Sequence, residues 1–251
     1  MNKVDQIRKI SIWVFILPLI VLNLCLIISI NYQLLENTIF LVDQIGRISF
    51  TIPYIDGGVS ISRTARTYPA YLIFKPGMII TAILLIRYWI LNNSLFKTIN
   101  NETQKNYRFL FFGIISAIFL ITHSIFLGIH FENDLYKFFR RFIILCFIIF
   151  EVIAQILLVI SFLKTKNKIS EMINKKILIV KIILVSALTI SALVSLPFLV
   201  SSGHTNFKHA LEWNYFIGVI LFYLLSFLFW KKNPPQVHAP SSVDKDIIYK
   251  G

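Results

Sequence analysis

The sequence predicts an all-α integral membrane protein, built as a bundle of six transmembrane helices. Three observations lead to this fold class. Hydrophobic residues make up 57% of the 251-residue chain, above the roughly 45–50% usual in soluble domains. The mean hydropathy is +0.74. Charged residues gather between six long apolar runs, as expected when they mark the loops of a membrane protein.

Each apolar run is long enough to cross a bilayer, which takes about 20 residues of helix. The predicted helices cover residues 10–30, 71–91, 109–129, 141–163, 176–201 and 212–230. Lys3, Arg8 and Lys9 precede the first run as in a signal peptide, but its 21 residues exceed a typical signal core of about 7–15. We therefore expect a retained helix and one transmembrane domain over residues 1–232. The proline-rich residues 233–251 predict a disordered cytoplasmic tail.

The distribution of lysine and arginine predicts both termini on the cytoplasmic side, where these residues are in excess. This orientation places 14 of them in cytoplasmic segments and 6 in outer segments. The net charge of +13 then comes largely from residues that flank the membrane, so anionic lipid headgroups are the expected partner. No basic patch with interleaved aromatics lies outside the apolar runs, so we expect no nucleic acid partner. A glycan on the sequons at Asn92 or Asn101, both predicted cytoplasmic, would overturn this topology.

The first outer segment, residues 31–70, is too long for a bare connector. We expect a functional or partly structured loop that packs over the outer mouth of the bundle. Cys25 and Cys146 both fall inside apolar runs, so the sequence predicts neither a disulfide framework nor a CxxC metal site. We accordingly expect no metal and no cofactor, and we assign no catalytic residue.

Glu151 lies near the centre of the fourth apolar run, and Gln155 follows one helical turn later on the same face. An acid at mid-bilayer is costly and indicates a functional site by default. One interpretation is a polar face that holds a proton, an ion or a lipid headgroup. The other is a joint between helices, where such hydrogen bonds contribute about 0.6–2 kcal/mol. Both interpretations of Glu151 stay open. Lys181, near a helix end, is interpreted as snorkelling to the headgroups.

Four polar residues are predicted near the outer ends of the helices: Asp56, Lys75, His123 and Glu212. Two of them also have a purely structural interpretation. Lys75 is placed where a lysine snorkels to the membrane surface, and a lone histidine such as His123 is more often a packed hydrogen-bonding residue. Together the four predict a polar cluster that contacts a lipid headgroup.

Two motifs resemble those of the DRAM family of six-helix membrane proteins. One is Pro53-Tyr54-Ile55-Asp56-Gly57-Gly58 in the first loop, before a second helix that opens Phe74-Lys75-Pro76-Gly77. The other is Leu211-Glu212-Trp213 at the start of the last helix, and Gly128-Ile129-His130-Phe131-Glu132 is weakly similar to the turn after the third helix. The family takes in damage-regulated autophagy modulators, relatives active in lipid remodelling of GPI anchors, and yeast plasma-membrane proteins that affect lipid asymmetry. The resemblance implies six helices with both termini inside.

The same resemblance carries Asp56 and Glu212 over as candidate site residues. The sequence departs from the family at two positions. Asp56 follows Ile55 directly where the family has a serine between them, and Arg140 stands where the family has a histidine. Any role tied to that histidine is therefore in question for this chain.

Three functions stay open. The first is a lipid-interacting membrane protein, without catalysis, that binds or helps to organise or remodel lipid at the outer leaflet through the four outer polar residues. The second is an intramembrane lipid-modifying enzyme with His123 and a carboxylate as acid and base, although no GxSxG or HExxH motif supports it. The third is a proton-coupled transporter with Glu151 as the relay, against which stands the lack of inverted repeats. Membrane lipids are the expected partners, and a homo- or hetero-oligomer within the membrane stays open.

Overall fold

The computed structural model describes residues 3–40, 42–101, 106–129, 134–200 and 203–232. Six of its helices are long and apolar enough to cross a membrane, which confirms the predicted class. These are α1 (Lys3–Ile30), α3 (Tyr71–Asn100), α4 (Arg108–Phe126), α5 (Asp134–Lys164), α7 (Lys175–Val200) and α8 (Thr205–Phe229). Two short helices, α2 (Ile61–Ala65) and α6 (Lys166–Ile169), lie between them. The predicted disordered tail falls outside the described residues.

Most of the long helices continue past the apolar runs that predicted them. Helix α1 begins seven residues before the predicted position 10, and α3 runs to Asn100 rather than 91. Hydropathy locates the part of a helix inside the hydrocarbon, whereas backbone hydrogen bonds continue into the polar flanks. Helix α4 differs in the other direction. It ends at Phe126 rather than 129, because Leu127 is extended and Gly128 has a left-handed φ of 84°.

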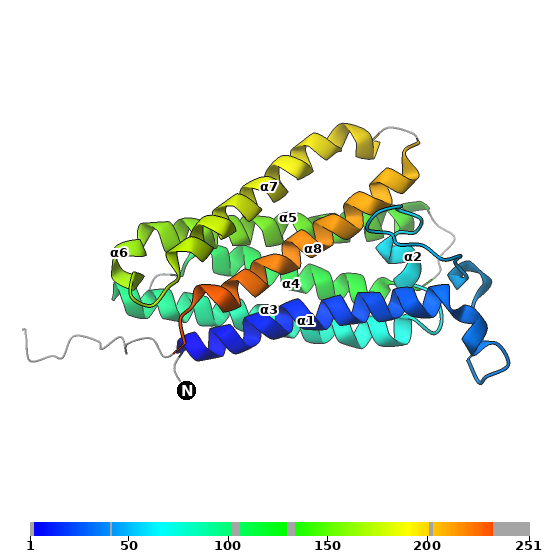
Figure 1. The fold of residues 1–251 in the computed structure, drawn as a ribbon, viewed down its shortest axis with the longest axis horizontal. Helices are drawn as coiled ribbons and strands as arrows, with labels where there is room; N and C mark the ends of the chain where they lie inside the picture. Colours follow the sequence, from blue (N-terminus) through cyan, green and yellow to red (C-terminus); the bar gives the residue numbers. More distant parts are fainter. Residues whose placement is uncertain (1–2, 41, 102–105, 130–133, 201–202, 233–251) are drawn as a thin grey trace, which may run out of the picture.

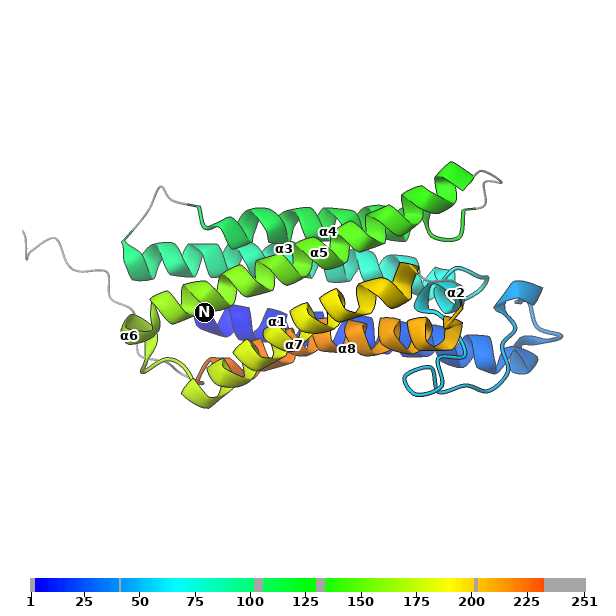
Figure 2. The ribbon, with the colours of Figure 1, turned by 90° about the horizontal axis from the view of Figure 1, so that it is seen from above.

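The six long helices lie side by side along the long axis of the molecule (Figures 1 and 2). Helix α1 packs against α3 and α8, α3 against α4, and α4 against α5, while α7 packs chiefly against α8 and α5. The start of α1 meets the end of α8, where the Arg8 guanidinium lies 5.0 Å from the Phe227 ring. The linker before α7 reaches the same place, because the Asn174 amide donates to the Phe229 carbonyl at 2.8 Å. We call this end of the bundle the terminal end, and the opposite end, which carries residues 31–70, the loop end.

Aromatic side chains fill the centre of the bundle. Tyr88 and Trp89 of α3 and Tyr223 of α8 are each at most 1% exposed. The Tyr88 and Tyr223 rings meet edge to face at 5.0 Å, a favourable geometry for aromatic pairs. Gly113 of α4 makes room for this cluster, because a Cβ there would lie 2.4 Å from the Trp89 ring. The close contact between α3 and α4 therefore depends on a residue without a side chain.

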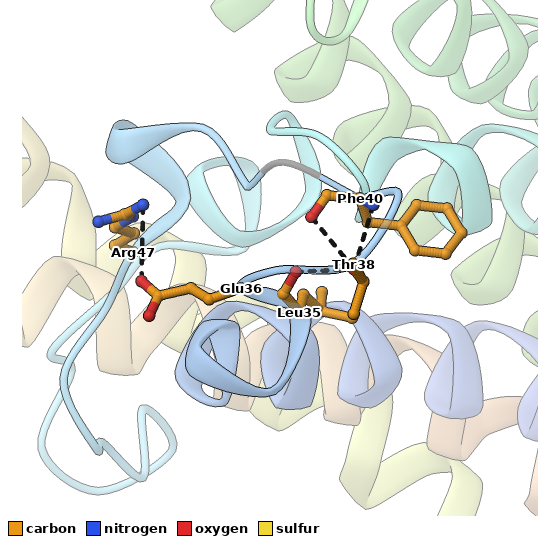
Figure 3. Close-up of polar contacts among 5 residues, drawn as sticks. All are labelled: Leu35, Glu36, Thr38, Phe40 and Arg47. Atoms are coloured by element: carbon orange, nitrogen blue, oxygen red, sulfur yellow. Dashed lines mark hydrogen bonds and ion pairs between the residues drawn. The ribbon is translucent and has the colours of Figure 1, made fainter.

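Residues 31–70 form a partly structured loop, as the sequence predicts. Two 3-10 turns, η1 (Tyr32–Leu35) and η2 (Gln44–Gly46), precede α2. The stretch between the turns is held by local polar contacts (Figure 3). The Thr38 hydroxyl donates to the Leu35 carbonyl at 2.7 Å, and Arg47 pairs with Glu36 at 3.6 Å. Both charged groups are exposed, so this pair contributes little, about 0–1 kcal/mol.

Candidate functional site

The loop is anchored to the start of α8. Trp213 Nε1 donates to the Val59 carbonyl at 2.9 Å, and His209 Nδ1 lies 3.0 Å from the Gly57 carbonyl. Gly57 has a φ of +61°, and a Cβ there would lie 1.7 Å from the Asn206 carbonyl oxygen. Only glycine permits this approach of loop backbone to helix backbone. The glycine of the Asp-Gly-Gly motif is therefore a packing requirement.

Asp56 closes the turn that precedes this anchor. Its Oδ1 accepts hydrogen bonds from the Thr51 hydroxyl at 2.5 Å and the Gly58 amide at 2.9 Å. Its Oδ2 accepts from the Ile52 amide at 2.8 Å. These donors, the Thr51 hydroxyl first, hold the pKa of the Asp56 carboxyl below its ordinary value. Both carboxylate oxygens are thus engaged within the loop itself.

Glu212 holds α2 against α8. Its half-buried carboxylate is hydrogen-bonded by the backbone amides of Ile61 and Ser62, the first two residues of α2. A negative charge is favoured at a helix N-terminus, where the amides lack intrahelical partners. The two acids carried over by resemblance, Asp56 and Glu212, therefore shape the loop and fix its short helix.

Lys75 and His123 lie at the same end but make separate contacts. The Lys75 ammonium lies 5.3 Å from the centre of the Tyr71 ring, one turn earlier in α3. His123 of α4 is 8% exposed, its ring meets Phe74 at 6.5 Å, and its Nδ1 has no hydrogen-bond partner. Within the described part of the chain, no hydrogen bond, ion pair or ring contact joins any two of the four predicted outer residues. Of the four, only His123 has a buried polar atom left without a partner.

Three arginines gather near His123, and sequence reasoning did not single them out as a site. Arg63 and Arg66 lie at the end of α2, and Arg140 lies in the second turn of α5; we call these three residues the arginine cluster. Burial and the charges of Arg140 and Arg63 lower the pKa of Arg66. His123 lies in the last turn of α4, where its carbonyl accepts from the Leu127 amide at 2.9 Å. Basic groups from α2, α4 and α5 thus share one corner of the loop end.

The turn after α4 positions this corner. Gly128 packs against the Arg66 backbone, since a Cβ on Gly128 would lie 2.9 Å from the Arg66 carbonyl oxygen. The Tyr136 hydroxyl donates to the Phe126 carbonyl at the end of α4, at 2.7 Å. The Arg140 guanidinium lies 5.2 Å from the centre of the Tyr136 ring. Backbone and ring contacts therefore fix the places of both arginines.

The arginine cluster has polar atoms without partners. The Nε atoms of Arg66 and Arg140 are buried and make no hydrogen bond, and neither guanidinium pairs with an acid in the described residues. Buried polar groups in folded proteins are nearly always hydrogen-bonded, and like charges held together repel. An anion with several acceptor oxygens would relieve both conditions. This corner is our candidate site.

A second polar set lies in the middle of the bundle. Glu151 of α5 is fully buried and accepts hydrogen bonds from Ser116 of α4 at 2.6 Å, from Gln155 at 3.1 Å and from the Tyr223 hydroxyl of α8. Gln155 also donates to the Val219 carbonyl of α8 at 3.2 Å. The carboxyl group is satisfied by three helices, so its geometry favours the interpretation as a joint between helices.

Lys181 of α7 corrects a prediction, because it does not snorkel to the membrane surface. It is fully buried, its ammonium donates to the Ser226 hydroxyl at 2.7 Å, and it lies 4.0 Å from the centre of the Phe222 ring. The Ser226 hydroxyl is also 3.0 Å from the Tyr88 hydroxyl. The side chain turns into the bundle because polar and aromatic groups of α8 provide contacts for a cation there.

Comparisons with family models, with curated proteins and with solved structures give no match for this chain. The resemblance to the DRAM family therefore stays a prediction that rests on the motifs quoted above. No group of three or more His, Cys, Asp or Glu that suits a metal ion occurs among the residues that the structure describes. The geometry of the two polar sets is thus the basis for any functional conclusion.

Proposed function

We propose that this protein binds the phosphate-bearing headgroup of a membrane lipid at its loop end, without catalysis, and so helps to organise lipid in that leaflet. The observation that carries the proposal is that three buried nitrogens at this corner, Nε of Arg66, Nε of Arg140 and Nδ1 of His123, make no hydrogen bond. With the predicted topology, in which both termini are cytoplasmic, this leaflet is the outer one.

The chemistry of the cluster suits a phosphate group. A guanidinium presents parallel N–H donors that match two phosphate oxygens, which gives both energy and orientation. Two arginines and the His123 imidazole supply donors from three elements, so a single phosphate has partners on several sides. Charge-assisted hydrogen bonds contribute about 1.5–3 kcal/mol each. An anion here would also offset the repulsion between Arg63, Arg66 and Arg140.

The surroundings of the cluster suit a lipid rather than a soluble anion. Arg140 belongs to a membrane-spanning helix, whose neighbouring residues Phe138 and Phe142 are exposed and stack at 6.3 Å. An exposed aromatic pair beside cations at a helix end offers apolar contact next to a phosphate site, as a lipid headgroup with its acyl chains requires. Lys75 of α3 lies near the same corner, because Tyr71, which it contacts, packs beside Gly128.

The predicted residues Asp56 and Glu212 have an indirect part in this proposal. Asp56 shapes the turn that reaches α8, and Glu212 holds the start of α2, whose other end carries Arg63 and Arg66. Loss of either acid would displace α2 and weaken lipid binding without removing a ligand contact. The acid-base pair of the enzyme hypothesis is not supported, since no described carboxylate is hydrogen-bonded to His123.

The proposal is tested by titrating the purified protein in detergent with dioctanoyl-phosphatidylglycerol. The Arg66→Gln/Arg140→Gln variant should bind at least tenfold more weakly than wild type, because losing one charge-assisted hydrogen bond of about 1.5–3 kcal/mol already corresponds to tenfold or more. The control is Arg47→Gln/Lys208→Gln, which removes the same charge from the loop end outside the cluster. Equal weakening in both variants, or none in the first, would contradict the proposal.

A further inference from the structure

A hollow of about 740 Å³ lies at the terminal end of the bundle, between the end of α3, the start of α4 and the end of α5. Its volume is within the range of about 300–1,000 Å³ typical of small-ligand sites. Three cations line it: Arg108, Lys164 and Lys168. It is at the opposite end of the molecule from the arginine cluster, so it has no part in the function proposed above.

The cations of the hollow have no acidic partner among the residues that the structure describes. Among the described residues none of the three makes an ion pair, and the hydrogen bond found for them is from Lys168 to the Asn100 side-chain oxygen at 3.0 Å. Helix α4 begins at Arg108, and its N-cap residue Tyr107 provides no side-chain cap. The positive end of that helix dipole therefore adds to the three charges and favours an anion.

The polar rim of the hollow is held in place by hydrogen bonds. The Asn100 side-chain oxygen accepts from the Lys168 ammonium, and the Asn100 side-chain nitrogen donates to the Tyr107 hydroxyl at 2.6 Å. Asn93 accepts from the Tyr107 amide at 3.0 Å and donates to the Asn106 side-chain oxygen at 3.2 Å. These contacts fix the end of α3 to the start of α4, so the polar groups of the rim are arranged before any ligand binds.

The remaining wall of the hollow is apolar. Leu157 and Ile160 of α5 and Phe109 of α4 line it, on the side that leads from the helix ends toward the middle of the bundle. A ligand that fits carries negative charge at the helix ends and hydrocarbon toward the bilayer. Inorganic phosphate has no hydrocarbon part to contact this apolar wall, whereas basic pockets between transmembrane helices recognise anionic lipid headgroups.

We propose that this hollow binds the headgroup of an anionic phospholipid from the leaflet at the terminal end. Arg108 and Lys164 contact the phosphate, Lys168 holds the rim, and the first part of an acyl chain follows Leu157 and Ile160. With the predicted topology, this is the cytoplasmic leaflet, so the chain holds lipid headgroups at both faces of the membrane.

The test uses the full chain in detergent, in the Arg66→Gln/Arg140→Gln background so that the loop end does not contribute. Dioctanoyl-phosphatidic acid, dioctanoyl-phosphatidylcholine and inorganic phosphate are titrated separately. We expect phosphatidic acid to bind at least tenfold more tightly than the other two. Adding Arg108→Gln/Lys164→Gln should weaken it at least tenfold, whereas adding Lys9→Gln/Lys232→Gln, exposed cations at the same end, should change it less than twofold.

Each other outcome overturns the inference in its own way. Equal binding of inorganic phosphate and phosphatidic acid would show an anion site without lipid recognition. Equal loss in the two added variants would show only a general effect of charge. No binding in this background, with binding in wild type, would place the lipid at the loop end alone, so failure here is distinguishable from failure of the proposed function. Arg108 and Lys164 are exposed, so their substitution leaves the fold intact.

Discussion

Some buried polar side chains in this protein are hydrogen-bonded to other protein groups, and others have buried polar atoms without any partner. Glu151 has donors from three helices, whereas Arg66, Arg140 and His123 each have a buried nitrogen without a hydrogen-bond partner. A satisfied group stabilises the fold that surrounds it, and an unsatisfied set of like charge costs stability until an anion binds. We therefore interpret Glu151 as a structural residue, and our proposal places ligand binding at the loop end.

The structural assignment of Glu151 predicts the outcome of two substitutions. Glu151→Leu leaves the Ser116, Gln155 and Tyr223 donors buried without their acceptor, so it should lower the free energy of unfolding by about 1–3 kcal/mol. Glu151→Gln retains a carbonyl oxygen and should cost less. Thermal unfolding of the detergent-solubilised protein measures both. A Glu151→Leu protein as stable as wild type would show that these hydrogen bonds contribute nothing.

Asp56 predicts a pH dependence of the loop. Its pKa is lowered in the folded chain, so its stabilising contribution is complete above the unfolded value of about 3.9 and is lost as the pH falls through the lower folded value. Hydrogen exchange of amides 51–58, corrected for intrinsic rates, should show protection at pH 6 that declines below about pH 4. Asp56→Asn should lack that protection at every pH, and Glu36→Gln should behave as wild type. A loop with the same protection in Asp56→Asn would refute the assignment.

Apolar runs alone located all six long helices, because a span of hydrocarbon requires a fixed length of apolar helix. The same signal misplaced several helix ends, since ends depend on caps and turns such as the left-handed Gly128 that stops α4. The sequence alone also does not show which face of each helix packs against its neighbours. The position of Lys181 in its apolar run predicts its depth, but whether it faces lipid or α8 depends on how α7 packs.

The contact between α3 and α4 predicts a difference between two glycines. A Cβ on Gly113 would meet the Trp89 ring at 2.4 Å, and one on Gly218 would meet the end of the Leu188 side chain at 2.6 Å. A rigid indole in a filled core cannot move aside, whereas a leucine methyl group changes rotamer. Gly113→Ala should therefore cost about 1–3 kcal/mol of stability and Gly218→Ala less. Thermal unfolding of the two variants compares them, and equal costs would contradict this account of the helix contact.

The candidate site was only partly predictable. The sequence predicts Asp56 and Glu212 as parts of a polar cluster, but their role in shaping the loop and holding α2 depends on contacts between the loop and α8. Arg66 and Arg140 come from segments far apart in sequence, so only the packing of α2 against the turn after α4 brings them together. The sequence gives one indication that Arg140 matters, because it stands at the position where the DRAM family has a histidine.

At the scale of the whole molecule, each end of the bundle carries a group of cations. The arginine cluster lies at the loop end, and Arg108, Lys164 and Lys168 lie at the terminal end. The excess of lysine and arginine in segments at the terminal end predicts that this end is cytoplasmic. The two proposals made above together assign one lipid-headgroup site to each end.

The structure refines the test of this topology. Asn92 is fully buried within α3, so its sequon cannot carry a glycan on either side of the membrane. Asn101, the exposed C-cap of α3, is the informative site. Expressed in a secretory-pathway host, the chain should carry no glycan at Asn101, while a sequon introduced into the loop at residues 36–38 should be modified. Endoglycosidase treatment detects a glycan at either site. A glycan at Asn101 would show that the orientation is the reverse of the predicted one.

The central claim is that the loop end holds a lipid headgroup, and the lipid that co-purifies with the protein tests it most directly. Wild type, Arg66→Gln/Arg140→Gln and the control Arg47→Gln/Lys208→Gln are purified from the same membranes, and their bound lipids are identified by mass spectrometry. The account predicts a phospholipid enriched over the bulk membrane in wild type and in the control, and depleted in the cluster variant. Bulk lipid composition in all three samples would contradict it.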